Sequence, residues 1–233
     1  MKFADLLARA NDRLFIIAEA GVNHNGDLET AFRLVDAAID SGCDAIKIQT
    51  WITEKVYCTT RSVKPDYEMR LKTASQDVTN LPFLRQLSTM GLPIIFSTGA
   101  CTLAELAEAV EAVSFASREI IILHCVSSYP APFEQMNLTT IPNLAATFGF
   151  PVGFSDHTEG FEAACAAVAL GSRIFEKHLS LDREAPGPDH QASLEPAQMK
   201  IYCEALRNVH SALGDGIKRI MPCEMDARKA FRR

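Results

Sequence analysis

The sequence predicts an α/β fold, a TIM-type (β/α)8 barrel that is incomplete by about one strand–helix unit. Short apolar runs alternate along the chain with segments of helical periodicity, which is typical of a parallel sheet. Polar residues end nearly every apolar run, and a barrel opens all these strand ends on one face. The segment GVNHNG at 21–26 does not match the G-x-G-x-x-G turn of a dinucleotide-binding sheet, which also favours the barrel.

The first half of the chain predicts three strands and two helices. The first apolar run ends in Glu19, and the second carries Lys47 and Gln49 near its end. Between these runs, apolar residues recur at helical spacing up to Gly42, which ends the helix. The expected strands cover 15–19, 44–49 and a short 70–74, and the expected helices cover 27–41 and 81–90.

The second half continues the alternation. Thr102 and Glu105 have the spacing of a capping box, in which two side chains satisfy backbone amides at a helix start. The count reaches about seven strands, whereas a closed barrel of this class needs eight, so one unit is expected to be missing. The expected strands cover 93–97, 119–124, 151–154 and 173–176, and the expected helices begin at 102 and then cover 138–148, 160–170 and 196–213.

Composition and charge restrict the class of protein. The 233 residues carry a formal net charge of −6 and no sustained basic face before the last few residues, which argues against a nucleic-acid surface. No apolar run approaches the roughly 18 to 20 residues of a membrane span, and the first residues are too polar for a secretory signal. Seven cysteines are scattered without a C-x-x-C pair, as is typical of reduced thiols. We therefore expect a cytoplasmic protein without nucleic-acid or membrane partners.

Two histidines follow neighbouring strands of the predicted sheet. His157 ends the tripeptide Ser-Asp-His at 155–157, and His178 ends Glu-Lys-His at 176–178. Because successive parallel strands open on the same face, the two rings can meet around one metal or substrate. A single histidine is more often a hydrogen-bonded structural residue, but the pair favours a metal site. Lys47 lies inside an apolar strand, where an unpaired lysine is rare, and this favours an anion contact.

Eight segments stand in a fixed order that extends from about residue 14 to 231: AEAGVNHNGD (18–27), KIQT (47–50), TNLP (79–82), STG (97–99), LHCVSSYPAP (123–132), GFSDHTEG (153–160), EKHLSLDR (176–183) and PGPDHQASLEP (186–196). Together they resemble the N-acetylneuraminate (sialic acid) synthase family, which also includes legionaminate and spore-coat polysaccharide synthases. Several motifs in one order make the resemblance more specific than any single motif.

The resemblance implies a (β/α)8 barrel that condenses phosphoenolpyruvate with an N-acylated hexosamine such as N-acetylmannosamine. The product would be a nine-carbon 2-keto sugar acid of the sialic acid type, with release of phosphate. The resemblance also implies a divalent metal, usually manganese with magnesium or cobalt as alternatives, held by two histidines that match His157 and His178. Imidazole nitrogens suit such an ion, which would polarise the sugar aldehyde as a Lewis acid.

The resemblance implies further site residues by motif. Acids and an amide would contact the sugar, the attacking water and the reacting centre, while lysines and a serine would bind phosphoenolpyruvate through its phosphate and carboxylate. The catalytic residues it implies are Glu19, Gln49, Asp77 and Glu176, and the substrate-binding residues it implies are Lys47, Lys72, Ser75, Tyr129, Ser155 and Asp189.

Simpler structural roles stay open for several of these residues. Glu19 could cap a loop, and Lys72 and Ser75 could lie in a solvated loop. Asp189 could close a turn beside its prolines, and Tyr129 could pack on the prolines that follow it.

The chain departs from the family pattern in the middle. Gln76 and Asp77 stand where the family usually has glycine and glutamate, which alters the backbone shape and the carboxylate reach there. One strand–helix unit of the family is absent between about residues 69 and 72. We therefore expect a single synthase-type barrel domain over 1–233, without the small antifreeze-like C-terminal domain of the family.

Two other functions stay open. An incomplete barrel exposes two strand edges that need covering, so the chain could be a catalytically degenerate scaffold or assembly protein of the same family. Another metal-dependent barrel enzyme, such as a sugar isomerase, is the remaining alternative. Association of two chains would cover the edges, so a homo-oligomer, a homodimer in its simplest form, is expected on either view.

Overall fold

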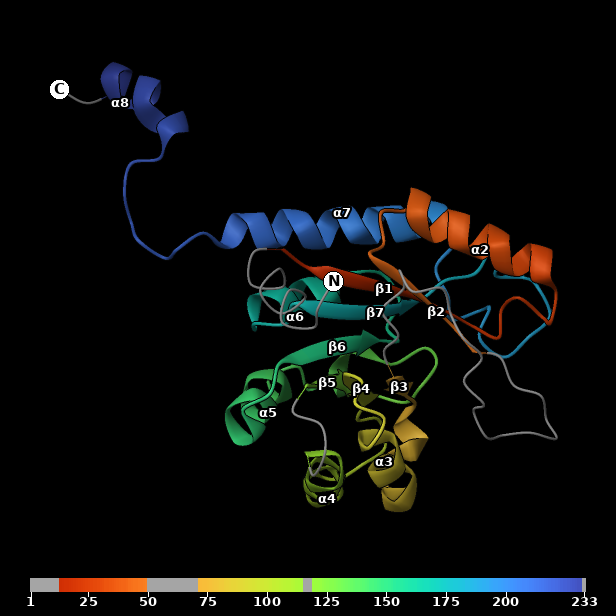
Figure 1. Ribbon diagram of the computed structural model, residues 1–233. Helices are drawn as coiled ribbons and strands as arrows, with labels where there is room; N and C mark the ends of the chain where they lie inside the picture. Colours follow the sequence, from red (N-terminus) through yellow and green to blue (C-terminus); the bar gives the residue numbers. More distant parts are fainter. Residues whose placement is uncertain (1–12, 50–70, 115–118, 232–233) are drawn as a thin grey trace.

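The computed structural model of the chain describes residues 13–49, 71–114 and 119–231. Seven parallel strands form one curled sheet in the order β2-β1-β7-β6-β5-β4-β3, with helices packed along its outer face (Figure 1). The predicted class, an incomplete TIM-type barrel, is therefore confirmed. The strands are β1 (Phe15–Gly21), β2 (Ala45–Ile48), β3 (Leu71–Thr73), β4 (Ile94–Ser97), β5 (Ile120–Cys125), β6 (Val152–Asp156) and β7 (Ile174–His178).

The first six helices begin within two residues of where the sequence predicts. Asp27 caps the first of them by accepting a hydrogen bond from the Thr30 backbone N at 2.8 Å. The capping box also forms, because Thr102 N donates to Glu105 Oε2 at 2.7 Å and Glu105 N donates to Thr102 Oγ1 at 3.3 Å. The α-helices are α2 (Leu28–Asp40), α3 (Leu81–Ser88), α4 (Leu103–Ser114), α5 (Thr140–Phe148), α6 (Glu162–Ala169), α7 (Pro196–Leu213) and α8 (Met225–Phe231), and the 3-10 turns are η1 (Ser75–Asp77), η2 (Phe133–Gln135) and η3 (Pro222–Glu224).

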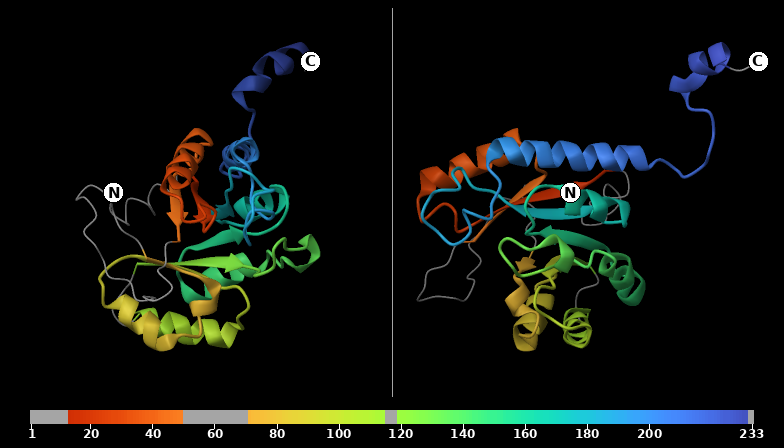
Figure 2. Two further views of the ribbon diagram at one scale, coloured as in Figure 1. Left: turned by 90° about the vertical axis from the view of Figure 1, so that its right-hand side faces the viewer. Right: turned by 180° about the vertical axis from the view of Figure 1, so that it is seen from behind.

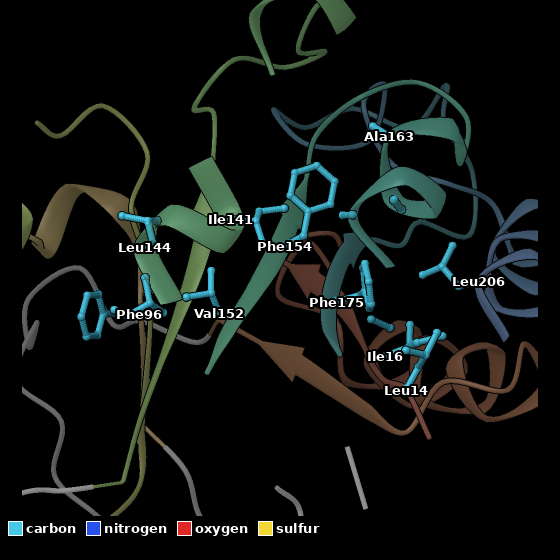
Figure 3. Packing of buried hydrophobic residues seen from close by; sticks show 14 of the residues in the cluster. Leu14, Ile16, Phe96, Ile141, Leu144, Val152, Phe154, Ala163, Phe175 and Leu206 are labelled. Carbon is cyan, nitrogen blue, oxygen red and sulfur yellow. The ribbon is translucent and has the colours of Figure 1, made fainter. Parts of the chain in front are cut away.

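Strand alternation divides the core into two layers. Phe96, Phe154 and Phe175 point outward and are buried between the sheet and the helices, as Figure 3 shows. Residues of the opposite parity fill the inside of the curl with a smaller apolar cluster that includes Ile17 and Leu123. The polar site residues continue this inner set toward the carboxyl ends of the strands, so the fold presents them above an apolar floor.

The two edges of the curled sheet are β2 and β3. Within the described part of the chain no ladder joins them, and the two views in Figure 2 show the sheet curling without closing there. The strand–helix unit expected to be missing falls in sequence between these two strands, and its junction borders residues 50–70, which lie outside the described residues.

The C-terminal residues were not predicted to form structure beyond α7. After α7 the chain runs away from the barrel as an exposed arm that ends in α8 (Figures 1 and 2). None of the helices in the described segments has the length and apolar character that crossing a bilayer requires.

Candidate active site

Strand register brings the charged residues to one edge of the barrel. Glu19 in β1 pairs with Lys47 on one side and with His178 on the other. Ser155 in β6 pairs with Glu176 in β7. Paired residues in a parallel sheet point to the same face, and here that face is the inside of the curl.

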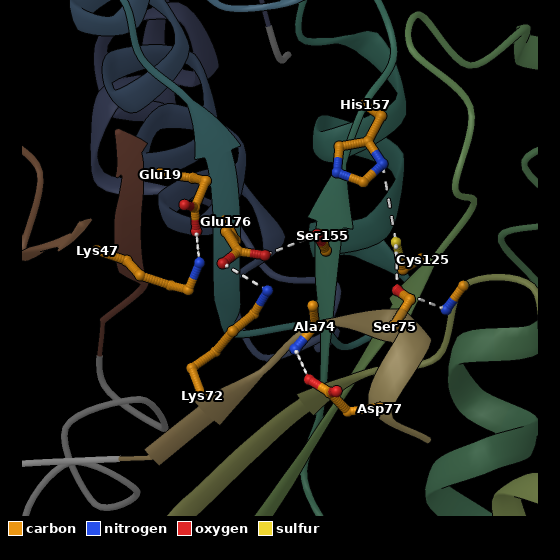
Figure 4. A network of polar contacts seen from close by, with 11 residues as sticks. Glu19, Lys47, Lys72, Ala74, Ser75, Asp77, Cys125, Ser155, His157 and Glu176 are labelled. Carbon is orange, nitrogen blue, oxygen red and sulfur yellow. Dashed lines mark hydrogen bonds and ion pairs between the residues drawn. The ribbon is translucent and has the colours of Figure 1, made fainter. Parts of the chain in front are cut away.

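Two lysines and two glutamates form a buried network at this edge (Figure 4). Lys47 Nζ lies 2.6 Å from Glu19 Oε2, and Lys72 Nζ lies 3.1 Å from Glu176 Oε1. Ser155 Oγ donates to Glu176 Oε2 at 2.7 Å. Both glutamate side chains are 3% exposed, so water screens these charges weakly. The network draws on β1, β2, β3, β6 and β7, and thus spans the open side of the barrel.

The two carboxyl groups ionise very differently. Burial, followed by the nearby negative charge of Glu176, raises the pKa of Glu19 to about 8. Burial also acts to raise the pKa of Glu176, but the charges of Lys72 and Lys47 outweigh it and hold that pKa well below its usual range. At neutral pH the site therefore contains two ammonium groups, one carboxylate and one carboxylic acid. The resulting excess of positive charge favours an anionic ligand.

His157, His178 and Tyr129 cluster beside this network. The His157 and His178 ring centroids are 5.4 Å apart, and the Tyr129 ring lies 4.1 Å from His157 and 5.5 Å from His178. Burial, followed by the positive charge of His157, lowers the pKa of His178 to about 3, so His178 is neutral at physiological pH. The predicted histidine pair is therefore brought together.

The chemistry of these two rings fits a metal ion. His157 Nδ1 lies 2.8 Å from the Val126 carbonyl oxygen, a contact that places a proton on Nδ1, so Nε2 is the ligand atom when the ring gives up its second proton to bind a metal. His178 is neutral, and its buried Nδ1 has no hydrogen-bond partner among the described residues. No group of three or more acidic, histidine or cysteine side chains with ligand spacing occurs in the described segments. The protein would thus supply two ligands and leave the other positions to substrate or water.

A small hydroxyl-rich recess adjoins the lysines. Ser75 Oγ accepts a hydrogen bond from the Gly99 backbone N at 3.0 Å. A methyl group added at Gly99 would lie 1.9 Å from Ser127 Oγ and 2.7 Å from Ser75 Oγ, so only glycine leaves room for both hydroxyls. Cys125 lies beneath, with Sγ 3.6 Å from Ser75 Oγ and 3.7 Å from His157 Nδ1. This recess supplies the hydroxyl groups of Ser75 and Ser127, which are of the kind that bind phosphate oxygens.

Asp189 reaches the site from the loop after β7. Its Oδ2 would lie 3.1 Å from a methyl group added at Gly21, and the same methyl would lie 3.3 Å from Glu19 Oε1, so the two acids face each other across Gly21. The next residue, His190, is buried and lies with Nδ1 2.6 Å from Ser180 Oγ. This hydrogen bond ties the loop to the strand end and fixes the backbone on which Asp189 stands.

Two predicted residues lie differently from the rest. Gln49 is fixed through its backbone, where its N donates to the Gly21 carbonyl at 2.9 Å and its O contacts His24 Nε2 at 3.1 Å. Asp77 Oδ2 accepts from the Ala74 backbone N at 3.2 Å, and Figure 4 shows its carboxylate turned to its own loop. The other ten predicted residues converge on the open edge of the barrel.

Three residues of the site were not predicted from the sequence. Ser127 and Cys125 lie in a motif that carried the resemblance, but nothing in their spacing assigned them to a phosphate recess. His190 directly follows Asp189, and a histidine beside a predicted site acid was the available signal for its positioning role.

A separate cavity of about 340 Å³ lies on the outer side of the barrel between the loop after β6 and α7. Its walls include Phe161, Arg183 and Tyr202, and none of the predicted site residues lines it. The chemistry of the chain is concentrated at the strand ends and not in this cavity.

Known proteins resemble this chain in both sequence and fold. The NeuB family model matches residues 63–218. The N,N'-diacetyllegionaminic acid synthase of Campylobacter jejuni is 35% identical over 271 residues, which cover 91% of this chain and 81% of that protein. The crystal structure of a sialic acid synthetase from Leptospira borgpetersenii in complex with citrate superposes with a TM-score of 0.81 at 31% identity, covering 96% of this chain and 94% of the other.

A more distant likeness concerns the fold alone. A truncated 3-deoxy-D-arabino-heptulosonate 7-phosphate synthase from Thermotoga maritima reaches a TM-score of 0.67 at 14% identity, over 89% of this chain and 90% of that one. The aligned region of the Campylobacter relative, 271 residues, is longer than the 233 residues of this chain, so that relative contains residues without a counterpart here.

Proposed function

The chain belongs to the NeuB family, and from this premise we propose that it condenses phosphoenolpyruvate with an N-acylated hexosamine and releases phosphate. The product is a 2-keto sugar acid of the sialic or legionaminic acid type, nine carbons long. The observation that carries the proposal is the buried network in which Lys47 and Lys72 flank a protonated Glu19 and an ionised Glu176. Such a site binds an anion and holds a proton ready beside it.

Phosphoenolpyruvate carries its negative charge at two ends, and the site offers positive groups at matching places. Lys72 lies in β3, the strand that leads to Ser75, and the hydroxyl recess formed by Ser75 and Ser127 beside Gly99 suits the phosphate. Lys47 lies on β2, the other edge strand of the sheet, and suits the carboxylate. The excess positive charge of the network strengthens both contacts because the lysine side chains are only 16% and 15% exposed.

A divalent metal, manganese in our proposal, would be held by His157 and His178. When bound, such an ion supplies Lewis-acid polarisation of the sugar aldehyde. The residues support this through the Nδ1 contact of His157 with a backbone carbonyl and through the neutral state of His178. Tyr129, packed against both rings, closes the site on the solvent side.

Glu19 and Glu176 assist the steps in which bonds form and break. A carbon–carbon bond forms between the methylene carbon of phosphoenolpyruvate and the aldehyde carbon, and the aldehyde oxygen takes a proton. Glu19 holds that proton, because its pKa of about 8 keeps it a carboxylic acid at neutral pH. Water then adds at the carbon that bears the phosphate, and the bond between this carbon and the phosphate ester oxygen breaks. One proton of the water returns to Glu19 and the other leaves with phosphate. Glu176, held ionised by Lys72 and by Ser155, stabilises the positive charge that develops at that carbon.

One observation favours a second candidate. The described sheet leaves β2 and β3 as unpaired edges, and unpaired edges invite association. A homodimer that covers them is part of the synthase proposal, and a non-catalytic assembly role for the same scaffold is the alternative. We place either form in the cytoplasm.

Phosphate release tests the proposed function. The purified, folded chain should release phosphate from phosphoenolpyruvate only when an N-acylated hexosamine and manganese are both present, and a chelator should stop the release. His157→Ala should abolish the manganese-dependent turnover, whereas unchanged turnover would refute the metal assignment. If the folded protein releases no phosphate with N-acetylmannosamine or related hexosamines, the non-catalytic assembly role is the function that remains.

A further inference from the structure

Two cysteines far apart in the sequence meet on the outer side of the barrel, away from the site. Cys43 lies in the turn between α2 and β2, and Cys203 lies in the middle of α7. Their sulfur atoms are 3.7 Å apart, within hydrogen-bond distance for two thiols, and 160 positions separate the two residues along the chain. Both are free thiols.

Polar contacts hold the turn against α7 on both sides of the sulfur pair. Ser41 Oγ donates to the Pro196 carbonyl at 3.0 Å, near the start of the helix. One turn beyond Cys203, Arg207 Nη2 donates to the Gly42 carbonyl at 2.6 Å. The helix residues at 196, 203 and 207 share one face, since they are spaced by seven and four positions.

The residue after Cys43 fixes the turn to the sheet. Asp44 Oδ2 accepts from the Ile16 backbone N at 3.0 Å and lies 3.3 Å from Arg207 Nη2, while Asp44 Oδ1 lies 2.6 Å from Arg13. The backbone on each side of the sulfur pair is therefore anchored. To reach the disulfide bond length of about 2.0 Å, the two sulfur atoms would approach each other from 3.7 Å by side-chain rotation.

We propose that Cys43 and Cys203 form a site of oxidative modification that closes reversibly to an intramolecular disulfide. Cys43 is half-buried and accessible to a small oxidant, whereas Cys203 is buried behind it and acts as the resolving thiol. The hydrogen bond from Cys43, together with the Arg207 guanidinium, lowers the pKa of the Cys203 thiol against the effect of its burial, which supports the resolving role. The same hydrogen bond and burial raise the pKa of the Cys43 thiol, so its exposure and not its acidity selects Cys43 as the sulfur that the oxidant reaches.

The chemistry balances with a peroxide as the oxidant. Hydrogen peroxide transfers one oxygen to the Cys43 sulfur, which gives a sulfenic acid and one water. The Cys203 sulfur then attacks the Cys43 sulfur, so that the sulfur–sulfur bond forms and the sulfur–oxygen bond breaks. The hydroxyl leaves with the Cys203 proton as a second water. The two thiols thus lose two electrons and two protons, and a dithiol reductant restores them.

The cross-link would join the first strand–helix unit to the last barrel helix. Cys43 leads directly into β2, the edge strand that carries Lys47. A disulfide at this place ties that edge strand to α7 and so restrains the opening of the unclosed sheet. Because it closes a loop of about 160 residues, it should raise the Tm by roughly 5 to 15 °C.

Peptide mapping after controlled oxidation tests the site. The full chain with Cys223→Ser, which removes an exposed thiol, is reduced and treated stepwise with hydrogen peroxide. Its intact mass is measured, and the protein is then denatured and alkylated for mapping. We expect an intact mass two hydrogens lower, a cross-linked peptide pair containing Cys43 and Cys203, the higher Tm, and reversal of all three by dithiothreitol. The protein should remain a single chain throughout.

Matched variants separate this site from general thiol oxidation. Cys43→Ser should abolish the cross-link and the Tm shift, and Cys165→Ser, which changes another half-buried thiol, should keep both. Irreversible oxidation of Cys43 with Cys203 recovered as a free thiol would overturn the proposal. Cross-links that join other cysteines, or that join two chains, would overturn it equally. The mapping on unvaried Cys43 and Cys203 decides the question even where a serine variant folds poorly.

Discussion

Replacing Glu19 with glutamine removes a proton that the folded protein holds at neutral pH and that the unfolded chain releases. Burial next to the negative charge of Glu176 raises the folded pKa of Glu19 to about 8 from its ordinary 4.5. Between these two values the folded state binds one more proton than the unfolded state, so stability falls as pH rises. Glu19 therefore contributes stability that is complete below pH 4.5 and is lost as pH passes through 8.

The magnitude follows from proton linkage. One extra bound proton changes the free energy of unfolding by about 1.4 kcal/mol per pH unit. From pH 5.5 to 7.5 the wild type should lose about 2.5 kcal/mol relative to Glu19→Gln, since glutamine keeps the shape of the neutral acid without its proton. The opposite shift of Glu176 acts below its ordinary pKa and leaves this window unchanged.

Urea unfolding at several pH values measures the difference. Free energies of unfolding for the wild type and Glu19→Gln are plotted against pH from 5.5 to 7.5, and contributions from other groups cancel in the difference. Glu108→Gln, a change at an exposed residue of α4, is the matched control and should follow the wild-type slope. Parallel slopes for the wild type and Glu19→Gln would refute the assignment of a buried proton to Glu19.

Three further substitutions have direct structural consequences. Lys72→Met removes the ion-pair partner of the buried Glu176 carboxylate, so the free energy of unfolding in urea should fall by about 3 kcal/mol. The rate of phosphate release should also fall sharply. An unchanged KM for phosphoenolpyruvate would contradict the role of Lys72. Gly99→Ala places a methyl group 1.9 Å from a serine hydroxyl, and steady-state kinetics should show KM for phosphoenolpyruvate raised on the order of 10- to 100-fold, with equal KM values contradicting the recess. Lys177→Met leaves the fully buried carboxylate of Asp156 without its ion-pair partner, so the free energy of unfolding should fall by about 4 kcal/mol. The kcat per folded molecule should stay near the wild-type value because this pair faces the helices. A fall in kcat without a loss of stability would contradict that placement.

The sequence predicts most of the fold because local signals and the global topology agree. The strand at 15–19 and the helix after Asp27 both appear, with Asp27 as the capping residue. The short strand expected at 70–74 also appears, as Leu71–Thr73. The prediction of about seven strands matches the seven-stranded sheet. The final helix, Met225–Phe231, was not predicted, since it follows a segment of 3-10 and turn structure and buries none of its residues.

The sequence predicts which residues form the site but not the ionisation states of its acids. Strand ends in a barrel converge whatever their sequence separation, so His157 and His178 could be paired from the order of elements alone. The opposite pKa shifts of Glu19 and Glu176 depend on which lysine lies nearer each carboxyl and on burial, and neither is visible in the chain order. The contact of Cys43 with a residue 160 positions away is hidden for the same reason.

The fate of the bridging oxygen of phosphoenolpyruvate tests the synthase proposal most directly. Phosphoenolpyruvate labelled with oxygen-18 at the ester oxygen is incubated with the folded chain, manganese and the N-acylated hexosamine. The oxygen-18 content of the phosphate and of the sugar acid is then measured by mass spectrometry. The proposal predicts that the label leaves entirely with phosphate, in equal amount to a new 2-keto sugar acid. Label retained in pyruvate, with phosphate released and no sugar acid formed, would show simple ester hydrolysis and contradict the synthase function.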